Sequence, residues 1–121
     1  MSTLFNALVI DDDSNVRTTF KKALQHLGCR VTEAESAEKG INFLNNTNFN
    51  IVFAALCVKK MGARAVARWI KANRPNTKFI IITSWKGQLE TAILSADGIH
   101  GVVHKPLLFT EIREILLEQL G

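Results

Sequence analysis

Short strand-like runs recur along the 121-residue chain, all but the half-polar second of them largely apolar, and most are followed by a stretch with helical periodicity. These runs cover residues 4–10, 30–34, 51–58, 79–83 and 102–104. Fully apolar runs of this length are typical of central parallel strands that are covered on both faces. Strands that alternate with helices predict an α/β fold with a doubly wound parallel sheet.

The segments between the runs place apolar residues on one helical face and carry capping or helix-stopping residues at their ends. A short fourth helix is expected over residues 89–96. The predicted boundary residues are Asp13 or Ser14, Gly28, Ser36, Pro75 and Thr110. Five strands and five helices then form a single domain over residues 1–121. Right-handed crossovers favour a flavodoxin-like (βα)5 arrangement with strand order 2-1-3-4-5.

The composition is that of an ordinary water-soluble domain, with 47% hydrophobic and 21% charged residues. The longest apolar run is far shorter than the ~20 residues that span a bilayer, and the first residues lack the pattern of a signal peptide. The two cysteines, Cys29 and Cys57, lie far apart and form no metal or redox motif. We therefore expect a cytoplasmic protein with reduced thiols and no membrane contact.

Charge is segregated along the chain. Residues 39–89 contain nine Lys and Arg but no Asp or Glu, whereas the rest contains six basic and eleven acidic residues. Arg64, Arg68 and Lys71 share one face of the predicted third helix, near Lys59 and Lys60. This pattern favours a solvated basic face, or a docking face for an acidic partner. Direct contact with nucleic-acid phosphate is the lesser alternative.

Chemically distinctive residues follow the predicted strands, at the edge where doubly wound sheets bind their ligands. Asp11 and Asp12 follow the first strand, Ala55 ends the third, Thr83 ends the fourth and Lys105 follows the fifth. Adjacent carboxylates repel one another unless a cation or a helix N-terminus compensates them. The acidic run alone favours a capping residue with solvated neighbours. Together with the hydroxyl and the lysine, it predicts a cation pocket.

The sequence resembles the receiver domains of two-component response regulators over its whole length. The resemblance rests on ALVIDDDSNVRTTFKKALQHLGCRVTEAESAEKGINFL, on IIITS, and on HKP followed by an amphipathic helix. It implies phosphoryl transfer from a histidine kinase to an aspartate that ends the third strand. By the same resemblance, Asp11 and Asp12 match the acidic pair that holds Mg²⁺, Thr83 the hydroxyl and Lys105 the lysine. Pro106 matches a proline that typically follows a cis bond.

The same resemblance shows where this chain departs from the family pattern. Asn50 stands at the first Asp position of the third-strand motif, and Ala55 stands at the phosphoacceptor position. Val58 and Lys59 replace the usual Met-Pro, and Val102 occupies the position of the aromatic switch residue. Because several positions depart together, natural loss of the motif is favoured over a single engineered substitution.

The chemistry follows from these departures. An alanine methyl offers no nucleophilic oxygen, so we predict no catalytic residue and no enzyme activity. The vestigial pocket comprises Asp11, Asp12, Ala55, Thr83 and Lys105, in which Asp11 and Asp12 bind Mg²⁺ weakly or not at all. Without its acidic partner, Lys105 turns to one of these two carboxylates, or Lys59 or Lys60 neutralises the crevice. No other cofactor is expected.

The sequence therefore predicts a pseudo-receiver that acts as a phosphorylation-independent regulatory or dimerisation module, alone or at the N-terminus of a transcriptional regulator. The expected homodimer contact is the face made by helix 4, strand 5 and helix 5, with Leu89, Ile93, Val102 and Leu117 as its apolar residues. Nucleic acid would be contacted through an attached effector domain. The alternatives are a small-ligand or anion-binding module at the crevice, and a phosphoacceptor at Asp12 or Asp13.

Overall fold

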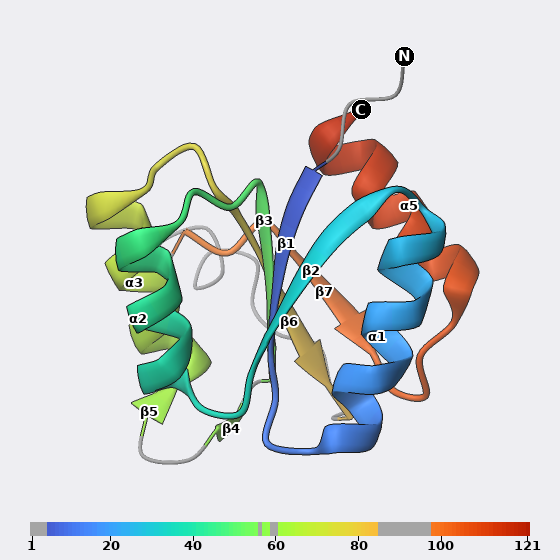
Figure 1. Ribbon diagram of the computed structural model, residues 1–121, viewed down its shortest axis with the longest axis horizontal. Helices are drawn as coiled ribbons and strands as arrows, with labels where there is room; N and C mark the ends of the chain where they lie inside the picture. Colours follow the sequence, from blue (N-terminus) through green and yellow to red (C-terminus); the bar gives the residue numbers. More distant parts are fainter. Residues whose placement is uncertain (1–4, 56, 59–60, 85–97) are drawn as a thin grey trace.

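A five-stranded parallel sheet lies at the centre of the computed structural model, which describes residues 5–55, 57–58, 61–84 and 98–121 (Figure 1). The strands are β1 (Phe5–Ile10), β2 (Cys29–Ala34), β3 (Ile51–Ala55), β6 (Lys78–Thr83) and β7 (Gly101–His104). Their spatial order is β2-β1-β3-β6-β7. Counted along the chain, this is the predicted order 2-1-3-4-5, so the flavodoxin-like fold is confirmed.

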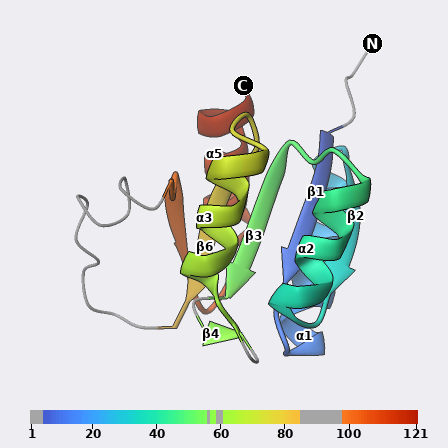
Figure 2. The ribbon, with the colours of Figure 1, turned by 90° about the vertical axis from the view of Figure 1, so that its left-hand side faces the viewer.

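Helices cover both faces of this sheet. Helices α1 (Ser14–His26) and α5 (Phe109–Leu120) pack on one face, and α2 (Ala37–Asn46) and α3 (Ala63–Asn73) pack on the other (Figure 2). Successive strand residues point to opposite faces, so the buried side chains divide into two core clusters. None of the helices within the described ranges is long and apolar enough to cross a membrane.

The predicted capping residues of the first two helices take their expected places. The Asp13 side chain accepts a hydrogen bond from the Asn15 backbone N–H at 2.8 Å, which makes Asp13 the N-cap of α1. Ser36 caps α2 by accepting from the Lys39 N–H at 3.2 Å. Gly28 follows α1 with φ +91°, a left-handed conformation that suits glycine at a helix end.

One predicted boundary is wrong, and one short strand pair was not predicted. The third strand ends at Ala55 as expected, but the next described part of the apolar run, β4 (Cys57–Val58), pairs antiparallel with β5 (Met61–Gly62). The last helix begins at Phe109 rather than Thr110, with Leu108 at its N-cap position and no side-chain cap. The predicted helix over residues 89–96 lies outside the described residues.

Close packing near the end of β1 requires a glycine in α2. A Cβ atom built on Gly40 would lie 2.3 Å from Cδ1 of Ile10, far closer than real carbon atoms approach. Ile10 is itself completely buried and immediately precedes Asp11. Gly40 therefore lets α2 sit close to the strand end that carries the first residue of the candidate site.

Candidate functional site

The carboxyl ends of the strands bring most of the predicted pocket residues to one edge of the sheet, at the bottom in Figure 1. Asp11 follows β1, Ala55 ends β3, Thr83 ends β6 and Lys105 follows β7. The strand register pairs Ala55 with Ile82 and Thr83 with His104, so the strand ends lie level. The backbone N–H of Lys105 donates to the carbonyl oxygen of Thr83 at 2.8 Å.

Asp11 is a buried carboxylate, with 1% of its surface exposed. Its Oδ1 accepts a hydrogen bond from the backbone N–H of Asp13 at 2.9 Å. Its Oδ2 receives no hydrogen bond among the described residues, but it lies 3.4 Å from Nζ of Lys105. Of the two partners that the sequence offered Lys105, the structure therefore shows Asp11. Asp12, the other, is exposed.

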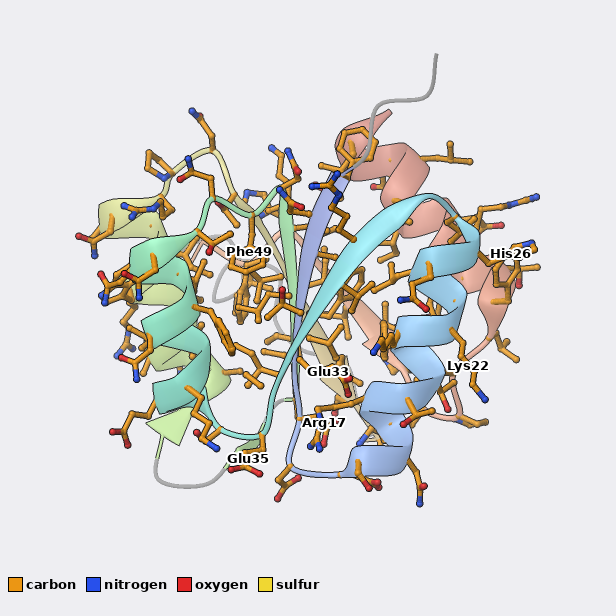
Figure 3. All side chains as sticks on the ribbon, in the orientation of Figure 1. Arg17, Lys22, His26, Glu33, Glu35 and Phe49 are labelled. Atoms are coloured by element: carbon orange, nitrogen blue, oxygen red, sulfur yellow. The ribbon has the colours of Figure 1, made fainter. Side chains whose placement is uncertain are left out.

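Sequence reasoning missed a second set of charged residues beside Asp11. Arg17 of α1 donates from Nη1 to the backbone carbonyl of Asp11 at 2.6 Å, and its Nε lies 3.4 Å from Glu33 on β2 (Figure 3). Lys21 lies 3.7 Å from the other oxygen of Glu33. The available signal was the i, i+4 spacing of Arg17 and Lys21 on the first helix, followed by a strand with a carboxylate near its end. Arg17 helps to hold the Asp11 backbone in place.

Two further residues of the predicted pocket are buried but bring no charge to it. Ala55 is 6% exposed and offers a methyl group, and Thr83 is 4% exposed. The Lys105–Pro106 bond is cis, as the family resemblance implied. Among the described residues of the predicted pocket, Asp11, Thr83 and Lys105 therefore bring a buried carboxylate, a hydroxyl and an ammonium to this edge, and Ala55 ends the central strand with an apolar side chain.

The predicted docking residues are distributed over separate surfaces. Arg64, Arg68 and Lys71 are all exposed along α3, whereas Lys59 and Lys60 lie outside the described residues. On the α5 side, Leu117 is 63% exposed. Val102 is half-buried and packs against the core cluster under α2 and α3, so it contributes less to a surface patch than expected. Leu89 and Ile93 also lie outside the described residues.

A surface that the sequence did not predict runs between α1 and α5. One hollow of about 330 Å³ is lined by residues that include Val16, Thr19 and Pro106. A second, of about 440 Å³, is lined by Lys22, Ala23, His26 and Phe109. Beside them Leu108 and Phe109 are 57% and 41% exposed, and the Phe109 ring meets His26 edge-on at 5.5 Å.

A parallel sheet in this order, with an acid, a hydroxyl and a lysine on its strand ends, defines a receiver-type signalling domain. The family model described as the response regulator receiver domain matches residues 7–117. The chain therefore belongs to the response regulator receiver family of two-component signalling. Domains of this family interact with proteins such as kinases and effectors, and they are generally signalling modules rather than enzymes.

Known relatives and structures agree with this assignment. The chain is 26% identical over 118 residues to Sensor kinase CckA of Brucella abortus (strain 2308), covering 93% of this chain and 12% of that protein. It is 29% identical over 115 residues to Ethylene receptor 3 of Oryza sativa subsp. japonica, covering 90% and 13%. The chain thus spans about an eighth of the length of these curated relatives. The chemotaxis response regulator CheY4 of Vibrio cholerae shares the fold, with a TM-score of 0.90 and 18% identity over 98% of this chain and 100% of that chain.

The magnesium ion that the family resemblance implies fits this edge poorly. Mg²⁺ requires about six oxygen ligands in near-octahedral geometry. At this edge one oxygen of Asp11 is already hydrogen-bonded, the other faces an ammonium, and Ala55 offers no oxygen from its side chain. Within the described ranges, no group of three or more His, Cys, Asp or Glu residues is arranged to hold a metal.

Proposed function

We propose that this receiver domain is a pseudo-receiver, which regulates through protein contacts and does not depend on aspartyl phosphorylation. The observation that carries the proposal is Ala55, a buried methyl side chain at the end of β3, where the family resemblance requires the phosphoacceptor. Phosphoryl transfer needs a nucleophilic oxygen, which alanine lacks. Val102, at the position of the aromatic switch, supports the loss of the phosphorylation response as well.

The remaining carboxylates are poorly suited to replace the missing acceptor. Asp13 accepts the hydrogen bond that caps α1, and both oxygens of Asp11 face donors or an ammonium. Asp12 is exposed, and it lies after β1 and not at the end of β3. No residue in this set occupies the end of the central strand, so we infer that the domain has no catalytic residue.

Intact-mass measurement after incubation with acetyl phosphate and Mg²⁺ tests this proposal. We expect the mass of the protein to stay unchanged. Addition of one phosphoryl group to the wild type would contradict the proposal. The Asp12→Asn and Asp13→Asn variants would then show whether the group is still added or is lost. The two variants then separate an alternative acceptor on the acidic run from one elsewhere.

The proposed output is a contact with a protein partner or with a second copy through the β7–α5 face. Leu117 supports this choice, because it is 63% exposed and offers an apolar side chain for such a contact. Molar mass in solution, measured by light scattering, should show a dimer that Leu117→Ser weakens. The matched control is Glu118→Ser on the next, exposed position. If the wild type is a monomer at all concentrations, the partner of this face is a different protein.

The alternative of an anion-binding module has less support. It would use the Lys105 ammonium to attract the ligand, but that ammonium faces the buried Asp11 carboxylate. Contact of the exposed α3 residues with nucleic acid is likewise the lesser proposal, and salt-sensitive retention on heparin would raise it. We infer that the domain works in the cytoplasm, by itself or as a single domain of a longer transcriptional regulator.

A further inference from the structure

The pairing of Asp11 with Lys105 raises the question of what balances the buried negative charge at this edge. Taking an ionised carboxylate out of water is unfavourable unless an opposite charge or hydrogen bonds compensate it. Asp11 is 1% exposed, and among the described residues its carboxylate accepts a hydrogen bond at Oδ1 alone, from the Asp13 N–H. Arg17 donates to the backbone oxygen of Asp11 and not to its carboxylate. The charge on Oδ2 is met by Lys105, at 3.4 Å.

A divalent cation and this ammonium compete for the same oxygen. A magnesium ion lies about 2 Å from a carboxylate ligand. Bound to Oδ2, it would therefore lie within about 5.5 Å of Nζ, where like charges repel strongly in a partly buried site. The third strand offers no compensating carboxylate, because it ends in Ala55. Binding the metal would require Lys105 to leave Asp11.

We propose that the Lys105 ammonium is the resident cation of this edge and takes the place of a divalent metal. Resting on the proposed function, the inference explains how a receiver without a phosphoacceptor keeps its acidic strand end buried. The Asp11–Lys105 pair connects the segments after β1 and β7, which lie on either side of β3 and β6. The conformation of the edge then becomes independent of Mg²⁺.

Metal titrations on the whole chain test this inference, with Mg²⁺ and Mn²⁺ as the probes. We expect the melting temperature of the wild type to respond to millimolar Mg²⁺ no more than that of Asp11→Asn. Lys105→Met should lose stability in metal-free buffer and regain part of it with Mg²⁺. Its affinity for Mg²⁺ should be at least about tenfold tighter than that of the wild type. The control is Lys22→Met, an exposed lysine on α1 (Figure 3).

A saturable Mg²⁺ response of the wild type that Asp11→Asn abolishes would overturn the inference. If Lys105→Met does not fold, the wild type alone decides the question through Mn²⁺ relaxation in NMR spectra. Amide signals of residues 11–13 should broaden no more than that of the exposed Glu114, and selective broadening at residues 11–13 would overturn the inference.

The two proposals fail separately. Metal binding at Asp11 with no mass increase from acetyl phosphate would overturn the resident-cation inference and leave the pseudo-receiver function in place. A phosphorylated wild type would overturn the pseudo-receiver function, whatever the titration gives.

Discussion

Polar side chains at the two ends of the sheet are held in different ways. At the amino end, three polar side chains form hydrogen bonds with the backbone. The Asn50 Oδ1 accepts from the Asn6 N–H at 2.8 Å, the Thr77 hydroxyl donates to the Phe49 carbonyl at 2.7 Å, and the His100 Nδ1 accepts from the Phe79 N–H at 3.0 Å. At the carboxyl end, Asp11 depends on an ion pair with Lys105.

The difference predicts how each end of the sheet responds to substitution. Hydrogen bonds between neutral side chains and the backbone tolerate conservative change. A buried charge is sensitive to its surroundings, because removing or adding one partner leaves a charge uncompensated. Substitutions at the carboxyl end should therefore have larger effects than similar substitutions at the amino end.

The largest effect is expected from Ala55→Asp, which puts a second carboxylate at the strand end beside that of Asp11. In neighbouring strands, residues in register lie about 5 Å apart, and Ile10 and Ala54 are such a pair. We expect a loss of about 3 kcal/mol in the free energy of unfolding without metal, because one ammonium cannot compensate two buried carboxylates. Chemical denaturation measures this loss, and Mg²⁺ should restore part of it.

The neutral variant Ala55→Asn separates the charge from the added volume. It should show no response to Mg²⁺ and a smaller loss of stability. Equal losses in the two variants, with no effect of Mg²⁺ on either, would show that crowding rather than charge governs this position.

A smaller effect is expected at the amino end from Thr77→Val. Thr77 is 5% exposed, and the substitution keeps its shape while removing the hydrogen bond to the Phe49 carbonyl. The free energy of unfolding should fall by about 1 kcal/mol. Thr19→Val is the control, since the exposed Thr19 hydroxyl bonds to the Asn15 carbonyl within α1. A loss at Thr77 as large as that of Ala55→Asp would remove the contrast between the two ends.

The next effect depends on pH and concerns His100. Burial, followed by the nearby positive charge of Lys78, lowers the pKa of His100 below its usual value. The unfolded chain then binds the proton more readily, so stability is full above the unfolded pKa of about 6.5 and is lost as pH falls through the lowered folded value. Protonation also removes the acceptor for the Phe79 N–H.

Denaturation curves across this pH range, recorded for the wild type and His100→Gln, measure the contribution. The variant should show a flatter dependence, whereas His26→Gln on the exposed side of α1 serves as the matched control. An unchanged slope in His100→Gln would mean that the imidazole does not stabilise this end of the sheet.

The smallest effect is expected from Asn50→Asp, which restores the residue typical of the family. A carboxylate can accept the Asn6 N–H as the amide oxygen does, so the free energy of unfolding should change by less than about 0.5 kcal/mol. Asn50→Ala, which removes the acceptor, should cost about 1 kcal/mol. If Asn50→Asp produced Mg²⁺ binding, the amino end would no longer count as purely structural.

The fold was predictable because its determinants are local. Apolar runs of strand length, the caps Asp13 and Ser36, and the glycine after α1 mark most elements without reference to the rest of the chain. The end of the third strand at Ala55 was predicted, but the reversal that follows it was not. The residues on both sides of this strand end are apolar, and the reversal into β4 and β5 depends on pairing between strands.

The sequence predicted which residues lie at the candidate site but not all of the contacts that they make. Strand ends place Asp11, Thr83 and Lys105 at one edge in any sheet of this order. Which carboxylate Lys105 contacts depends on side-chain burial, and Asp11 is buried whereas Asp12 is exposed. The contact of Arg17 with the Asp11 backbone was missed, because a carbonyl partner leaves no signature in the residue types.

The two edge strands bear on how copies of this domain meet. An edge strand offers unpaired backbone groups to a neighbouring molecule unless it is short or carries charge. Here β7 has four residues, and β2 carries Arg30 and Glu33 along its length, with Glu33 held by Arg17 and Lys21. Growth of the sheet from one copy into the next is therefore disfavoured. If copies associate as proposed, the helical surfaces rather than the sheet edges would form the contact.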